Sequence, residues 1–146
     1  MAQQDRVAFL RDTARARPTI GLVVPYTSPA FTARALAQAL QLAEGLDMTV
    51  TLMGVHVLPY PTPLECQEGI RQRCEAELAA VARTCPVTTR VKLAFARNRE
   101  EAYLVLIPRE SLVVIGVKES WWKTGDERLA RRLAEHGRTV AIVYGS

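Results

Sequence analysis

The sequence predicts one α/β domain, a three-layer open sheet of five parallel strands with helices on both faces. Short aliphatic runs, the clearest being Leu112–Gly116, have the continuous apolar character of strands that are buried on both sides. Between these runs lie segments with apolar residues at helical spacing. Because strands that alternate with single helices are joined by right-handed crossovers, we expect the strands to run parallel.

Composition limits the classes of protein to consider. At 146 residues and 49% hydrophobic, the chain is long enough for one core. No apolar run approaches the roughly 18 residues of a membrane span, and residues 1–17 lack the apolar region of a signal peptide. The net charge of +4 comes from scattered arginines rather than a basic run. We therefore expect a cytoplasmic protein that neither inserts into membranes nor binds nucleic acid.

Three cysteines fall on or near one stripe of a predicted helix. Cys66, Cys74 and Cys85 recur with apolar residues at intervals of three or four. An odd number of cysteines in a chain that looks cytoplasmic argues against a disulfide framework, and small core side chains are the plain interpretation. Neither histidine stands at a metal-ligand spacing from them, so we expect no metal site.

The first segment has helical spacing over residues 2–17, and Pro18 ends it. We therefore expect an N-terminal helical extension, residues 1–18, followed by the α/β domain, residues 19–146. The extra helix would pack on the domain or against a partner subunit.

The domain begins with a strand over residues 19–24. Ser28 and Pro29 are a typical N-cap and first helical residue for the helix that follows, which ends near Gly45. A second strand within residues 48–58 leads to Thr62, which forms a capping box with the glutamate three residues on and begins the cysteine-bearing helix.

The second half continues the alternation. A third strand over residues 87–95 has the polar alternation typical of a sheet edge. Asn98 begins the next helix, and Thr124 begins the last one, because each is followed three residues later by a glutamate. The aliphatic strand described first lies between these helices, and residues 139–144 form the fifth strand.

Ligands of open α/β sheets bind beyond the carboxyl ends of the strands, at the point where the strand order reverses. With one reversal in this sheet, the loops after the first and fourth strands meet there. We therefore expect the functional crevice between residues 25–29 and residues 117–125.

The order and spacing of these pieces resemble the universal stress protein family. The resemblance covers nearly the whole chain after Pro18. It rests on a first strand ending in Val24-Pro25, an alanine-rich helix ending near Leu42-Ala43-Glu44, a second strand closing on Val55-His56-Val57, a fourth strand ending at Gly116, and the last strand. It implies the sheet order 3-2-1-4-5 and frequent dimers through the last strand.

Nucleotide-binding members of that family carry an Asp in the first loop. After the fourth strand they carry Gly, two residues, Gly, nine residues, then Gly and Ser or Thr. Here Gly116 fits the first position, but the second falls on Glu119 and the final pair on Leu129 and Ala130. Thr27 stands where the Asp is expected. The nucleotide motif is therefore lost.

The chemistry of the loop points the same way. Glycines let backbone N–H groups approach a phosphate, whereas this loop carries bulky tryptophans, and Asp126 and Glu127 already satisfy the dipole of the last helix. We therefore expect no cofactor and no ATP bound in the usual way; the alternative is ATP or AMP binding through an altered loop, with slow ATP hydrolysis. The candidate crevice residues are Pro25, Tyr26, Thr27, Val57, Gly116, Lys118 and Lys123.

Two features predict protein contacts. The tryptophan pair either packs over the core or stands at the rim of the crevice as an anchor for a partner. The last strand alternates apolar residues at an expected sheet edge, so we predict a homodimer. The predicted interface residues are Trp121, Trp122, Val140, Ile142 and Tyr144.

Catalysis has no motif in its favour. Ser28, Ser111 and Ser120 have neither an adjacent His nor a G-x-S-x-G frame, so we do not expect an enzyme. The sequence predicts a regulatory or interaction domain in the stress response. The alternatives are a nucleotide-binding member with an altered loop and an accessory subunit that docks on a larger protein.

Overall fold

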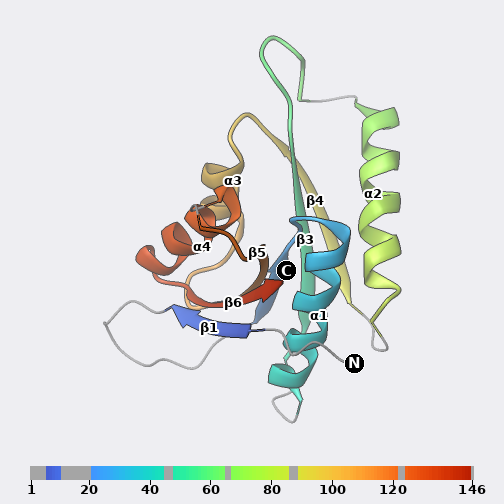
Figure 1. The fold of residues 1–146 in the computed structure, drawn as a ribbon. Coiled ribbons are helices and arrows are strands. Elements are labelled where there is room, and N and C mark those ends of the chain that lie inside the picture. Colours follow the sequence, from blue (N-terminus) through green and yellow to red (C-terminus); the bar gives the residue numbers. More distant parts are fainter. Residues whose placement is uncertain are drawn as a thin grey trace.

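The computed structural model describes residues 6–10, 21–44, 48–64, 67–85, 89–121 and 124–145. Within them, one sheet has the strand order β1-β6-β5-β2-β3-β4 (Figure 1). The strands are β1 (Arg6–Leu10), β2 (Leu22–Pro25), β3 (Val50–Val57), β4 (Arg90–Ala96), β5 (Leu112–Lys118) and β6 (Thr139–Gly145). The helices are α1 (Pro29–Ala43), α2 (Glu68–Ala82), α3 (Arg99–Leu106) and α4 (Gly125–Glu135).

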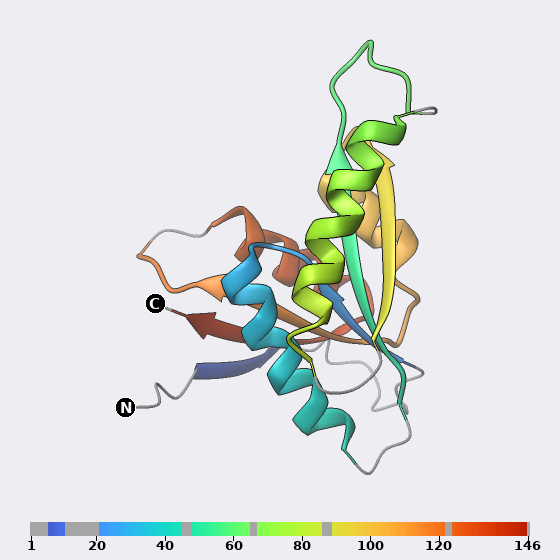
Figure 2. The ribbon, with the colours of Figure 1, turned by 90° about the vertical axis from the view of Figure 1, so that its right-hand side faces the viewer.

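The predicted parallel sheet is confirmed. Strands β4, β3, β2, β5 and β6 pair parallel with their neighbours, which is the expected order 3-2-1-4-5. Helices α1 and α2 cover one face and α3 and α4 the other (Figures 1 and 2). The sheet order therefore reverses between β2 and β5, as the switch-point argument requires.

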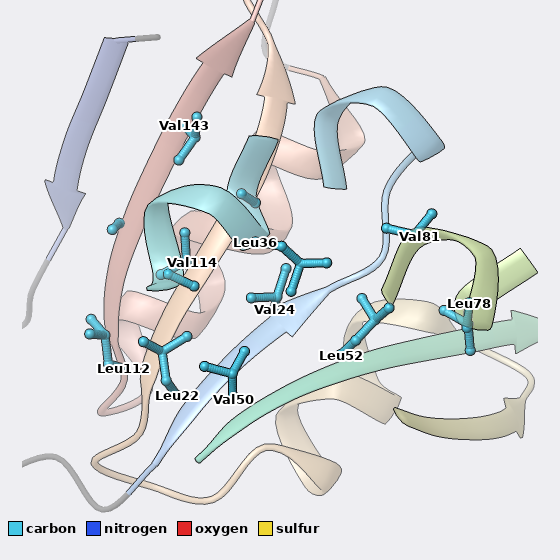
Figure 3. Close-up of a cluster of buried hydrophobic side chains, with 13 residues drawn as sticks. Leu22, Val24, Leu36, Val50, Leu52, Leu78, Val81, Leu112, Val114 and Val143 are labelled. Atoms are coloured by element: carbon cyan, nitrogen blue, oxygen red, sulfur yellow. The ribbon is translucent and has the colours of Figure 1, made fainter. Parts of the chain in front are cut away.

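Two apolar cores form because the central strands send alternate side chains to opposite faces. On one face, side chains of β2 and β3 such as Val24 and Leu52 meet Leu36 of α1 and Leu78 of α2 (Figure 3). On the other face, Ile115 of β5 belongs to the core beneath α3 and α4. Residues 112–117 of β5 are all buried, as expected for a strand covered on both sides.

Three of the four predicted helix starts are confirmed by their caps. Backbone N–H groups three residues on donate to the side chains of Ser28, Asn98 and Thr124, over 3.3, 3.0 and 3.1 Å respectively. The predicted start at Thr62 is wrong, because α2 begins at Glu68 with Gln67 as its N-cap residue. The Thr62 N–H donates instead to the Pro59 carbonyl in a turn. Pro63 is compatible with a first helical residue, as Pro29 is in α1, so the capping signal alone does not locate this helix start.

The predicted N-terminal helix is wrong over Arg6–Leu10. These residues form β1, which pairs antiparallel with β6, from Arg6 opposite Tyr144 to Leu10 opposite Val140. The remaining residues of the predicted helix lie outside the described ones. A segment of five residues is too short for its sequence to distinguish the period of a helix from that of a strand. Pairing with the otherwise open edge of β6 makes this segment a strand. As a result β6 is not an edge strand, whereas β4 is one, as predicted.

Candidate functional site

The loops after β2 and β5 do meet at the predicted switch point. The Thr27 hydroxyl donates to the Gly116 carbonyl over 2.8 Å, and the Thr27 N–H donates to the hydroxyl of the buried Thr32 over 3.0 Å. Thr27 thus joins the first loop to the end of β5 and to the first turn of α1. The residue in the position of the expected Asp serves to close the loop against the strand.

Helix α1 lies directly on the end of β5. A Cβ added to Gly116 would overlap the backbone carbonyl of Phe31, and one added to Gly145 at the end of β6 would overlap the Phe31 ring and the Arg34 guanidinium. Gly116 is therefore required for close packing of helix against sheet, whereas the atoms nearest Gly145 belong to side chains that can move. At the first glycine of the family pattern, the backbone of α1 fills the space that a side chain would occupy.

Charges at the start of α4 are internally balanced. Asp126 in its first turn accepts a hydrogen bond from the Arg99 guanidinium of α3 over 2.6 Å, and Glu127 pairs with Arg131 over 3.1 Å. Acidic side chains at this end interact favourably with the helix dipole. The position at which a phosphate would be expected therefore already holds two carboxylates.

Several other predicted crevice residues do not converge on this point. Pro25 is buried at the end of β2, and Lys118 is exposed at the end of β5. Val57, 43% exposed, lies four residues beyond Met53, the residue that pairs with Pro25. Lys123 lies outside the described residues. The structure brings together Thr27 and Gly116 and leaves Val57 at a distance along its strand.

A small hollow opens beside the closed crevice, beneath α2. It has a volume of about 100 Å³, and its polar lining consists of Tyr26, His56, Cys74 and Glu77. The Cys74 Sγ lies 3.5 Å from the His56 Nδ1, and the His56 ring meets the Phe95 ring edge to face at 5.9 Å. The remaining lining residues are Gly54, Val55, Leu78 and Leu93.

Alternation along β3 explains why these groups meet. Gly54 and His56 lie two residues apart and so face α2 together. Leu78 packs against Gly54, where an added Cβ would lie 3.0 Å from its side chain. Cys74, one turn before Leu78, is thereby placed over His56. We did not predict this site, although the alternation and the four-residue spacing were visible in the sequence.

Two groups of the hollow, the Tyr26 phenol and the Cys74 thiol, hold their protons more tightly than usual. Burial raises the pKa of the Tyr26 phenol, and the nearby Glu77 carboxylate raises it further. Burial also raises the pKa of the Cys74 thiol, again with a contribution from Glu77 and a smaller opposing one from Arg73. A neutral thiol is a weak nucleophile, so these groups suit hydrogen bonding better than attack on a substrate.

The predicted interface residues have different environments. Trp121 is fully exposed beyond the end of β5, whereas Val140 and Ile142 are fully buried and Tyr144 is half-buried beside β1. Trp122 lies outside the described residues. Among the described residues, only Trp121 of this predicted set presents its side chain fully to solvent.

Among the described residues, no group of three or more His, Cys, Asp or Glu side chains is arranged to hold a metal ion. No described helix has both the length and the apolar character to cross a membrane.

The fold defines the chain as an open, doubly wound α/β protein. No protein-family model matches the sequence, and no curated protein matches it either. Among solved structures, it is similar to a protein of the universal stress protein family from Burkholderia pseudomallei, over 86% of this chain and 96% of that chain. The sequence identity is 18% and the TM-score 0.49.

Proposed function

We propose that this chain is a regulatory interaction module of the universal-stress-protein type. In this proposal it acts in stress adaptation through contacts with other proteins, and it does not bind ATP through the glycine pattern of that family. The observed strand order is the one that the sequence resemblance implies. It supports the universal-stress-protein type of fold in this proposal.

The packing at the switch point is the observation that supports the second part. The Thr27 hydroxyl donates to the Gly116 carbonyl, and the Phe31 carbonyl of α1 fills the space that a Gly116 side chain would occupy, so this glycine is explained by packing alone. The carboxylates of Asp126 and Glu127 would oppose a triphosphate at the start of α4.

A fluorescence titration tests this part, because one tryptophan of the loop is fully exposed and environment-sensitive. We expect neither tryptophan emission nor the melting temperature to change with ATP, AMP or cyclic AMP at millimolar concentration, with or without magnesium. Saturable quenching together with a raised melting temperature would overturn the proposal.

Trp121 is the residue on which the interaction role depends. Large exposed aromatic side chains are enriched among binding hot spots, and this one stands at the carboxyl edge of the sheet where ligand sites concentrate. A partner docking there would bury the indole ring.

The interaction role is tested by capture from extracts of the source cells under stress. We expect a captured protein to be lost with Trp121→Ala and kept with Tyr60→Ala, which removes another large aromatic side chain that is 81% exposed elsewhere. Equal capture by both variants would contradict a role for Trp121.

The hollow beneath α2 favours a second candidate function, binding of the base of a nucleotide or another small planar ligand by an altered set of contacts. The phenol of Tyr26, the imidazole of His56 and the thiol of Cys74 would supply hydrogen bonds there. In this candidate the ligand enters between α2 and the sheet rather than at Gly116.

The NMR signals of the chain's two histidines distinguish ligand binding in the hollow from the interaction role. In a proton NMR titration with AMP, binding in the hollow would shift the imidazole signals of His56, while those of His136, exposed after α4, would stay fixed. His56→Ala would abolish the binding and His136→Ala would not. Unshifted signals from both histidines would leave the interaction module as the function.

A further inference from the structure

The edge of the sheet at β4 is open. Within the described part of the chain, β4 pairs with β3 and with no other strand, and Figure 2 shows no strand on its outer side. The opposite side of the parallel sheet differs, because β1 covers β6. Open edges of this kind are usually covered, charged or paired with another chain.

Hydrogen bonding to β3 identifies which residues of β4 face outward. The Ala96 carbonyl accepts from the Leu58 N–H, so Ala96 faces β3. Because alternate residues of a strand direct their backbone groups to opposite sides, Val91, Leu93 and Phe95 direct their N–H and C=O groups away from the sheet. These three residues are also the apolar ones on the α2 side of β4.

We propose that a second copy of this chain pairs with β4 in antiparallel fashion, about a two-fold axis through Leu93. Leu93 then lies opposite its own copy, and Val91 lies opposite Phe95, all as hydrogen-bonded pairs. The two sheets become one continuous sheet. This proposal is independent of the proposed function, since it involves neither Trp121 nor the crevice.

Side-chain charge and apolar contact favour this register over those with the axis one residue to either side. On the α3 side of β4, the exposed Arg90 and Lys92 lie opposite Ala96 and Ala94, which leave room for the long side chains. An axis moved to Lys92 would place two lysines opposite each other, which is destabilising. An axis moved to Ala94 would place Val91 opposite Arg97 and leave its apolar side chain, 39% exposed, without an apolar neighbour.

Helix α2 is positioned to extend the contact. An open hollow of about 310 Å³ lies between α2 and β4, lined by Arg71, Glu75, Ala79, Val91 and Leu93. The small side chain of Ala79 leaves space there for side chains of the second α2, which the two-fold axis would bring alongside. The two Glu75 carboxylates that approach the axis each have Arg71 of their own helix at 3.8 Å.

Sedimentation velocity tests the association. At about 100 µM, where a dimer with a micromolar dissociation constant is nearly complete, we expect twice the 16.2 kDa mass of the single chain. Val91→Lys should restore the monomer, because the new charge would be buried against Phe95 of the second copy. Ala37→Lys on α1, where the residue is exposed on a helix that packs over the centre of the sheet, should leave the dimer intact.

Cysteine crosslinking tests the register, in a variant whose three native cysteines are replaced by serine. Leu93→Cys should form an intermolecular disulfide, because the axis brings the two positions within the Cα separation that a disulfide requires. Ala94→Cys should not, since its two copies are displaced along the strands. Circular dichroism checks that each variant is folded.

Three results would overturn the proposal. The first is a monomer at all concentrations, and the second is a dimer that survives Val91→Lys. The third is preferential crosslinking of Ala94→Cys, which would place the axis elsewhere.

Discussion

Gly116 shows how a single residue sets the packing at the expected ligand site. Its missing side chain lets the Phe31 carbonyl of α1 approach β5, and its own carbonyl accepts the Thr27 hydroxyl. The presence of Gly116 could be interpreted from the sequence as a remnant of a phosphate loop. Its actual neighbour could not be predicted, because 85 residues separate Phe31 from it along the chain.

Substitution of Gly116 tests this packing. Gly116→Ala should lower the free energy of unfolding by roughly 1–3 kcal/mol, because the obstructing atoms belong to backbone and cannot rotate away. Gly21→Ala is the matched control, since a Cβ there meets no atom within 4 Å. Urea unfolding measures both, and equal effects would contradict the packing argument.

Tyr103 makes stability depend on alkaline pH. The residue is fully buried and its hydroxyl donates to the Met53 carbonyl over 3.1 Å. Burial raises its pKa from 10.0 to about 12, against a smaller lowering by Arg99. Because the folded protein holds the proton more tightly than the unfolded chain does, the associated stability is complete below pH 10 and is lost as the pH rises through 12.

The comparison with Tyr103→Phe isolates that contribution. Between about pH 9 and about pH 12, wild type should lose on the order of 2 kcal/mol more unfolding free energy than Tyr103→Phe. Tyr60→Phe, at an exposed position, should lose as much as wild type. Urea melts at several pH values measure the difference, and parallel curves for wild type and Tyr103→Phe would contradict the assignment.

Among the elements, α3 depends on a residue outside it. Arg138 precedes β6, is 5% exposed, and donates to the carbonyls of Leu104, His136 and Ile107 over 2.6, 2.6 and 3.2 Å. Two of these carbonyls lie at the C-terminal end of α3, where no backbone donor follows in the helix. The arginine thus satisfies a helix end that the local sequence leaves open.

Replacement of Arg138 should loosen that end. Arg138→Met should lower the free energy of unfolding by about 2–4 kcal/mol, because buried carbonyls lose a charged donor. Arg138→Lys should recover only part of the loss, since its ammonium lacks the planar fork that reaches several carbonyls. Hydrogen exchange should accelerate at the Ile107 N–H, which donates to Tyr103 in the last turn of α3. Unchanged exchange in Arg138→Met would contradict this role.

Helix starts were predictable where a single side chain decides them. Asn98 and Thr124 cap the helices that follow, as their sequence context indicated, because the capping bond spans only three residues. Thr62 has the same local signal, yet its N–H donates to the Pro59 carbonyl in a turn. A capping box therefore does not by itself locate the start of a helix.

At the scale of the whole molecule, β1 decides which edge of the sheet is available. We predicted a homodimer through β6, but β1 occupies the outer side of that strand. The covering strand comes from the segment for which a helix was predicted. The open edge is at β4.

Truncation tests the role of β1. Deletion of residues 1–10 should expose β6 and cause concentration-dependent self-association, together with a lower melting temperature. Deletion of residues 1–5 leaves β1 in place and should do neither. Both deletions are best made with Val91→Lys, so that association through β4 does not contribute. Sedimentation and light scattering measure the outcome, and a soluble, equally stable 1–10 deletion would show that β1 is dispensable.

The sequence by itself determined the parallel sheet, its order with the help of the family resemblance, and most helix boundaries. Apolar runs, helical spacing and caps are local properties, and a covered sheet follows from their alternation. The tertiary structure alone decided that Arg6–Leu10 is a strand, that Thr27 donates a hydrogen bond to Gly116, and that a hollow forms beneath α2. Each of these depends on residues far apart along the chain, whose contacts exist only after the helices have packed on the sheet.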